Sequence, residues 1–179
     1  MKGQFWSIDM VFAIVIFTGG ILLLSYIWSN INSQFSTSYG FSIGIMQLQL
    51  NGLLQRLQTE GSPHDWNSMI SANSVSTWSN VSVGLESSQA SGVLSRNKLL
   101  TLMSMSNNNY QSTKQVLGIG YDYYITISSQ GQYNMSIGLS PFQKNATAIQ
   151  TATVPVVLDD GQAATMRVIV WTNTTFGVG

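Results

Sequence analysis

The longest apolar segment lies near the beginning of the chain, where residues 10–28 read MVFAIVIFTGGILLLSYIW without a formal charge. A helix of that length reaches roughly 28 Å, close to the hydrocarbon thickness of a bilayer. A helix that is apolar on every side suits a membrane or the centre of an assembly, and a soluble domain seldom needs one. Residues 8–28 are therefore predicted to form a membrane-competent helix.

The helical pattern continues beyond this segment, but it becomes one-sided. Between residues 43 and 57 the apolar side chains follow a spacing of three and four, and glutamines lie off that stripe. We expect one long helix over residues 4–60, whose second part lies against a separate head and which ends at Gly61-Ser62-Pro63. The spacing of Gly40 and Gly44 suits a close helix contact, and the alternatives are a local bend or plain tolerance of glycine at these positions. The stripe consists of Met46, Leu50, Leu53, Leu54 and Leu57.

Residues 61–179 show shorter patterns that predict a globular head. Ser95 is the expected N-cap of a helix over 96–105, in which Leu99, Leu100, Leu102 and Met103 are expected to be buried. Trp78 is an expected core residue, and another short helix is expected over 110–117. One or two strands are expected within 75–85, and two hairpins over 121–137 and 151–172. The predicted fold class is α+β, with a small antiparallel sheet of four or five strands.

Composition narrows the function classes more than it identifies a function. Charged residues make up 8% of the 179 residues, and seven Lys+Arg balance seven Asp+Glu. There is thus no basic field for nucleic acid, and no nucleic-acid partner is expected. The chain has no cysteine, which removes disulfides and thiolate chemistry. No phosphate loop or hydrolase motif occurs, so we expect neither an enzyme nor a cofactor.

Two short motifs admit a chemical interpretation beside a structural one. His64 and Asp65 could form a proton-transfer pair, but we expect both to face water while Trp66 packs into the head. Asp159 and Asp160 could begin a calcium site, but without further spaced oxygen ligands a hairpin turn with Gly161 is the favoured interpretation. No catalytic or metal site is predicted.

Four Asn-x-Ser/Thr sequons fall within the predicted head and none within the long helix. Thirteen asparagines in a Ser/Thr-rich chain would give about three by chance, so their position is more informative than their number. We treat Asn80, Asn134, Asn145 and Asn173 as glycosylation candidates.

The motif Lys2-Gly3-Gln4, directly before the apolar helix, resembles the class III signal sequence of archaeal type IV pilins and related archaellins. Further segments resemble the family's helix-to-head junction (59–66), its middle (109–126) and its last strand (168–171). The resemblance implies that a prepilin peptidase cuts between Gly3 and Gln4, so that residues 1–3 are a leader. Bacterial pilins carry Glu as the fifth mature residue. Here Ile8 is fifth and Asp9 is sixth, which puts a contact between Asp9 and a neighbour's N-terminal amine in question.

The resemblance implies a type IV pilin-like fold and a structural role. The expected function is that of a homo-oligomeric helical filament subunit for adhesion or surface contact. It would reside in the cell membrane before assembly machinery moves it into an extracellular filament. The alternatives are a membrane-anchored pseudopilin-like surface protein and an archaellin-like subunit. The expected filament-core contacts are Phe5, Asp9, Phe12, Val15, Phe17, Leu22, Leu24 and Trp28.

Overall fold

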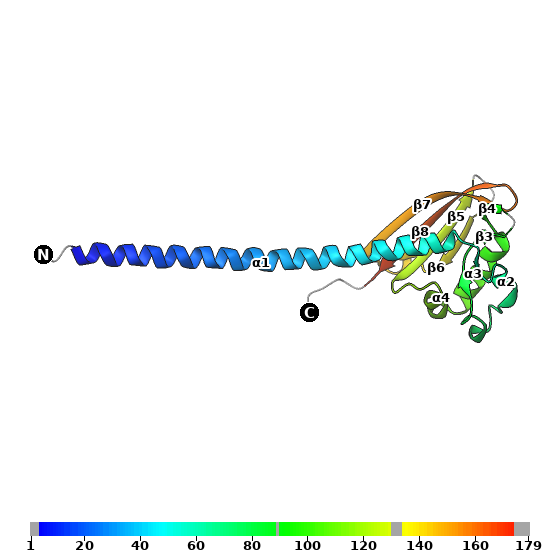
Figure 1. Cartoon of the computed structure of the whole chain (residues 1–179), viewed down its shortest axis with the longest axis horizontal. Coiled ribbons are helices and arrows are strands. Elements are labelled where there is room, and N and C mark those ends of the chain that lie inside the picture. Colours follow the sequence, from blue (N-terminus) through cyan, green and yellow to red (C-terminus); the bar gives the residue numbers. More distant parts are fainter. Residues whose placement is uncertain (1–3, 89, 130–133, 174–179) are drawn as a thin grey trace. The chain divides into compact units, whose positions relative to one another are not determined.

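The computed structural model describes residues 4–88, 90–129 and 134–173, without the side chains of residues 4–8 and 31–41. The chain divides into two compact units, Met1–Ser42 and Ile43–Gly179. Helix α1 (Gln4–Leu57) contributes to both units, because the division falls within it (Figure 1). Each unit is therefore described by itself.

The described part of the first unit is helical throughout. No proline interrupts residues 4–57, and the apolar composition of this segment favours a helix once water is excluded. Gly19 and Gly20 lie inside the helix, and a Cβ atom at either position would meet nothing within 4 Å. The described chain therefore gives no steric reason for these two glycines.

The second unit combines the last part of α1 with a six-stranded sheet, a two-stranded sheet and short helices (Figure 1). Beyond α1, the helical elements are α2 (Trp66–Met69), η1 (Val75–Thr77), α3 (Arg96–Asn108), α4 (Tyr110–Val116) and η2 (Pro141–Gln143). The strands are β1 (Gly61–Ser62), β2 (Ser82–Val83), β3 (Glu86–Ser87), β4 (Ala90–Leu94), β5 (Asp122–Ser129), β6 (Asn134–Gly138), β7 (Ala148–Leu158) and β8 (Ala163–Thr172). The α+β class is confirmed.

The large sheet is mixed, which corrects the expectation of an antiparallel sheet with four or five strands. Its order is β3-β4-β7-β8-β5-β6, and β4 runs parallel to β7 through Val93↔Val157 and Leu94↔Leu158. A parallel neighbour requires a long crossover connection, and here the chain from α3 to η2 provides it. The remaining strand pairs are antiparallel.

The two predicted hairpins are present. β5 pairs with β6 from Tyr124↔Gly138 to Ser128↔Asn134, and β7 pairs with β8 from Ala148↔Thr172 to Val157↔Ala163. At the second turn Gly161 has φ +80°, in the left-handed region that glycine adopts without strain. β7 begins at Ala148, earlier than the expected start at residue 151.

The core of the second unit lies between one face of the sheet and the apolar stripe of α1. Tyr123, Ile125 and Ile127 alternate inward on β5, and three inward positions on β8 do the same. The helix stripe meets this face because residues spaced by three and four share one side of a helix. The buried members of the stripe are Met46, Leu50, Leu53 and Leu57, whereas Leu54 is partly buried.

Several local expectations were wrong. Leu100 is 45% exposed, because α3 buries the face that carries Leu99, Leu102 and Met105. Met103 is only partly buried. Ser95 is the N-cap residue of α3, as expected, although its side chain makes no capping hydrogen bond.

The boundaries of two other predicted elements also differ. α3 continues to Asn108, whereas the sequence predicted an end at residue 105. Within the region 75–85, the structure contains η1 and only the two-residue strand β2.

The junction between α1 and the head is fixed by a buried tryptophan and two close backbone approaches. The Trp66 indole donates a hydrogen bond to Gly84 O at 2.9 Å, and Trp66 is fully buried. Gly61 has φ +81°, and a Cβ atom there would lie 2.7 Å from the Trp66 ring. A side chain at Gly84 would meet the backbone of Thr59. The chain therefore needs glycine at both positions.

Candidate functional site

The most conspicuous surface of the described chain is the helical segment Asp9–Asn30. It has a mean hydropathy of 2.4, and none of it is buried within the chain. By length and composition it is sufficient to cross a membrane. A contiguous apolar surface of this kind marks a site of protein or membrane contact.

The structure places the expected filament-core contacts on this surface as far as it describes them. Phe12 and Val15 are each 62% exposed, and Asp9 is exposed as well. The other four members are exposed to similar extents: Phe17 71%, Leu22 66%, Leu24 70% and Trp28 73%. None of this segment is buried within the described chain. Its apolar side chains are therefore available for contact with other molecules.

The N-terminal members of the predicted site fall at the limit of the structure. Gly3 lies outside the described residues. Gln4 and Phe5 belong to α1, but their side chains are not described. The processing site and the Phe5 contact therefore stay predictions.

A polar cluster joins α4 to β5 inside the head. The Tyr110 hydroxyl donates to Asp122 Oδ1 at 3.0 Å and accepts the Tyr123 backbone N–H at 3.0 Å. Lys114 Nζ lies 3.1 Å from the same carboxylate oxygen. The Tyr110 and Tyr123 rings stack with centroids 5.1 Å apart. The polar groups of this cluster thus bond to one another and hold α4 on the sheet.

Burial determines the titration of the two tyrosines in this cluster. It raises the pKa of Tyr123 to about 12, although the hydrogen bond from the Tyr123 hydroxyl to Ser106 Oγ acts in the opposite direction. Burial also raises the pKa of Tyr110, and the nearby Asp122 carboxylate adds to the increase. Both hydroxyls stay protonated at neutral pH, where each donates a hydrogen bond within the head.

A buried lysine connects three segments near the end of α1. Lys98 on α3 is 4% exposed, and its Nζ donates to the backbone oxygens of Glu60 at 2.7 Å and Glu86 at 2.8 Å. Burial lowers the pKa of Lys98, whereas the charges of Glu60, Glu86 and Asp65 oppose that change. Its two carbonyl partners indicate a structural role.

The carboxylates of the Asp159–Asp160 turn bind Arg96 of the same chain. Arg96 forms a salt bridge with Asp160 and donates from its side chain to Gln162 Oε1 at 3.0 Å. Asp159 Oδ2 accepts the Arg96 backbone N–H at 3.0 Å and so caps α3 in place of Ser95. The described residues contain no group of three or more His, Cys, Asp or Glu that could hold a metal ion. This arrangement favours the turn interpretation over calcium.

The His64-Asp65-Trp66 segment follows its structural interpretation. Trp66 is buried, and both His64 and Asp65 are exposed, as expected. The Asp65 backbone oxygen accepts the Ser68 hydroxyl at 2.8 Å.

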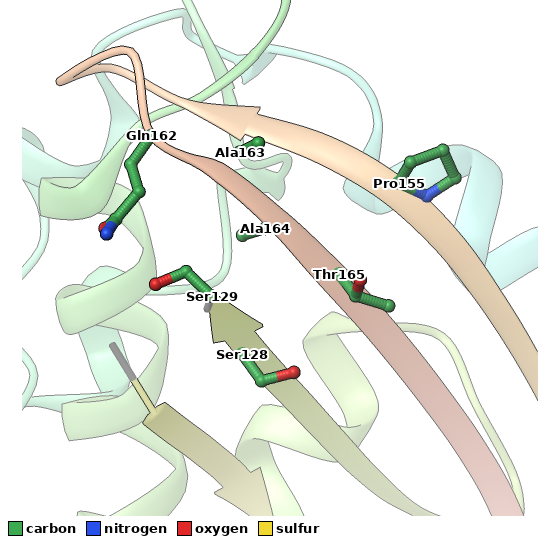
Figure 2. Close-up of a pocket in the computed structure, with 7 residues that line it drawn as sticks. All are labelled: Ser128, Ser129, Pro155, Gln162, Ala163, Ala164 and Thr165. Atoms are coloured by element: carbon green, nitrogen blue, oxygen red, sulfur yellow. The ribbon is translucent and has the colours of Figure 1, made fainter. Parts of the chain in front are cut away.

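An open hollow of about 630 Å³ lies at the end of the sheet where β5 stops (Figure 2). Ser129 and Gln162 extend toward each other across it. The described residues of its lining carry hydroxyl, amide and small apolar groups, with neither a carboxylate nor a basic side chain among them: Ser128, Ser129, Pro155, Gln162, Ala163, Ala164 and Thr165. These described groups supply no acid–base pair.

All four sequon asparagines are exposed. Asn80 precedes β2, and Asn134 begins β6. Asn145 has φ +51° in the turn before β7, and Asn173 directly follows β8. The Thr147 N–H donates to Thr172 O at 2.8 Å, so the last two sequons lie at the same end of the hairpin. Glycosylation at these positions stays a prediction.

Comparisons of the chain with protein-family models, curated proteins and solved structures found no match.

Proposed function

We propose that this chain is a structural subunit of an extracellular type IV pilus-like filament that polymerises through its N-terminal helix. The observation that carries the proposal is the 22-residue span Asp9–Asn30, which is apolar on all sides and unburied in the described chain. Such a span requires lipid or other apolar helices around it. Identical subunits that meet through unlike surfaces form rings where the rotation closes and open helical polymers where it does not.

The character of the head supports the proposal. The polar groups of the Tyr110–Asp122 cluster and of Lys98 bond within the head. The net charge of the chain is zero, so neighbouring copies would experience little mutual repulsion. The sequence resemblance to archaeal type IV pilins adds the expected processing between Gly3 and Gln4 and the membrane machinery for assembly.

The first test is electron microscopy of material sheared from cells that express the chain, with N-terminal mass spectrometry on the same sample. The proposal expects filaments whose subunit begins at Gln4. Filaments that retain Met1 would contradict the processing step but not polymerisation. Protein found only in the membrane fraction, without filaments, would favour the anchored surface protein instead.

A second test separates a filament core from a lipid anchor. We exchange Phe17 and Leu24, which are similarly exposed at 71% and 70%, so that composition and hydropathy stay constant. A lipid anchor tolerates this exchange, whereas packed helices respond to side-chain shape. We expect normal membrane insertion with a loss of filaments. Phe142→Leu, at a residue of the head that is 81% exposed, is the matched control and should leave filaments intact.

The processing step has its own test. Gly3→Asp places a charged side chain where the resemblance requires glycine. We expect the precursor to accumulate in the membrane with its leader attached. A mature mass identical to that of the unmodified chain would reject cleavage at this position.

A further inference from the structure

The longest strand of the head is paired on one side only over most of its length. β8 accompanies β7 from Ala148 to Val157. On the other side, β4 pairs only with Val157 and Leu158, and Figure 1 shows β7 extending well beyond it. Residues 148–156 therefore form an open edge among the described strands.

The hydrogen-bond pattern shows which residues present their backbone groups at this edge. The Leu158 N–H donates to Gln162 O at 2.9 Å, so residue 158 and every second residue before it bond to β8. The intervening residues Ile149, Thr151 and Thr153 point their N–H and C=O groups away from β8. Ile149 is 43% exposed, and both threonines are exposed.

This row of donors is limited at both ends. Pro155 has the same orientation but carries no N–H group. At the other end, the Thr147 N–H already donates to Thr172 O at 2.8 Å. Ile149, Thr151 and Thr153 thus form a short donor row with Thr151 at its centre.

The edge carries little protection against pairing. Natural sheets protect their edges with charged side chains, prolines or bulges. Between Lys144 and Asp159 this chain has no charged residue, and Pro155 lies beyond the donor row. The segment AIQTATV (148–154) is uncharged, lacks proline and glycine, and contains β-branched residues, which is typical of segments that pair with their own copies.

We propose that the open edge of β7 binds the same edge of a second copy, antiparallel, about a two-fold axis at Thr151. Thr151 then lies opposite Thr151 of the second copy, and Ile149 lies opposite its Thr153. Each of these pairs exchanges two backbone hydrogen bonds. A different register that places Ile149 opposite Pro155 loses a hydrogen bond, because proline has no N–H group. A register shifted by one residue places backbone groups that face the edge opposite groups that already bond to β8. Because the net charge of the chain is zero, two copies do not repel each other through their net charge.

This contact goes beyond the proposed filament function, because it uses the heads and does not require the N-terminal helices to pack. The two copies would form one continuous sheet across the axis. The occupant is a second copy because the donor row is complementary to itself in a single register.

Cysteine cross-linking of the full chain in detergent tests this register, since the chain contains no cysteine. In Thr151→Cys the two sulfurs face each other across Cα atoms about 5.5 Å apart, within the range of a disulfide. We expect a disulfide-linked dimer under mild oxidation. Thr153→Cys is the matched control, because its own copy lies about 13 Å away along the strand, and it should stay monomeric. A mixture of Ile149→Cys and Thr153→Cys should cross-link again.

A charge pair provides the second variant set. Thr151→Lys places two ammonium groups opposite each other, and we expect at least a tenfold loss of dimer affinity by analytical ultracentrifugation. Thr165→Lys adds the same charge on β8, away from the edge, and should dimerise like the unmodified chain. Equal cross-linking of Thr151→Cys and Thr153→Cys, or none, would overturn the proposal. So would a cysteine at residue 151 that captures a different protein in cells.

The outcomes separate this inference from the filament proposal. Filaments without the Thr151 cross-link would reject the edge contact and leave the filament function in place. A Thr151 cross-link in detergent without filaments on cells would reject the filament function and leave the edge contact.

Discussion

The two parts of α1 use apolar side chains in opposite ways. In Asp9–Asn30 the apolar residues are exposed on every side. In residues 43–57 most of them form one stripe that is buried against the sheet, whereas Ile43 and Leu48 are exposed together with glutamines and an asparagine. Secondary structure is the same in both parts, so the difference lies in what each surface contacts.

The comparison separates the residues that stabilise the fold from those available for association. Burial of the stripe at Met46, Leu50, Leu53 and Leu57 contributes to the free energy of folding of the head. The exposed segment Asp9–Asn30 is not buried within the described chain, so it makes no such contribution to the free energy of folding. Mutations in the two parts should therefore change different measurements.

The largest expected effect comes from the same truncation in the two parts. Leu50→Ala removes a fully buried side chain and should lower the free energy of unfolding of the head by about 3 kcal/mol. Leu22→Ala, at a position 66% exposed, should change it by less than about 0.5 kcal/mol. Guanidinium unfolding in detergent, followed by near-ultraviolet circular dichroism, measures both. Equal losses of unfolding free energy in the two variants would show that both parts of α1 stabilise the head to the same extent.

Alkaline pH should destabilise the head through its buried tyrosines. A tyrosine whose folded pKa is raised contributes stability that is complete below its unfolded pKa near 10 and is lost as pH rises through the folded value. For Tyr123, with a folded pKa of about 12, the loss reaches about 2 kcal/mol by pH 12. The raised pKa of Tyr110 acts in the same direction.

Unfolding measured from pH 10 to 12 tests this sign. Lys98 acts oppositely, because its lowered pKa makes the head gain stability as pH rises toward 10.5, so the tyrosine effect is clearest above that value. Tyr123→Phe should flatten the alkaline decline. A decline as steep in this variant as in the unmodified chain would assign the pH dependence to other groups.

A smaller effect is expected where the second part of α1 contains glycine. A Cβ atom at Gly44 or Gly52 would meet nothing within 4 Å. Alanine there should stabilise the head by about 0.5–1 kcal/mol, because glycine is unfavourable inside a helix. If Gly44→Ala also reduces filament formation while Gly52→Ala does not, the contact interpretation of the Gly40–Gly44 spacing is supported. An unchanged filament yield favours a local bend or plain tolerance of glycine.

The smallest effect should come from the exposed side of the second part. Leu48 is 72% exposed because it lies off the buried stripe of the same helix segment. Leu48→Gln should leave the free energy of unfolding within about 0.5 kcal/mol of the unmodified value. A larger loss in denaturant titration would mean that Leu48 belongs to the folded core.

The sequence was most informative where periodicity and turn chemistry agree. The long helix, its stripe from Met46 to Leu57, and the hairpin at Gly161 all follow from local patterns. The apolar segment predicted a membrane-competent helix, and the structure contains one over Asp9–Asn30 that is long and apolar enough to cross a membrane. Which partners cover it is a property of other molecules, so no local pattern determines it.

Long-range pairing accounts for most of what the sequence did not reveal. β4 contains Gly92 at φ +77° and shows no clear alternation, so its parallel pairing with β7 has no local signal. Lys98 resembles a solvent-exposed lysine on a short helix, and its carbonyl partners come from two other segments. The cap that Asp159 provides for α3 could not be predicted either, because the Arg96 N–H donor and the Asp159 acceptor are 63 positions apart in the sequence.

The order of the sheet also affects when the head can fold during synthesis. β8, the last strand of the described chain, lies between β7 and β5 in the interior of the sheet. The earlier strands therefore lack a central neighbour until residues 163–172 have left the ribosome, and such non-local pairing is slow to form. By then residues 9–30 have long been available to a membrane. Under the proposed function, the apolar helix enters the membrane before the head acquires its fold, and the assembly machinery then handles an unfolded head.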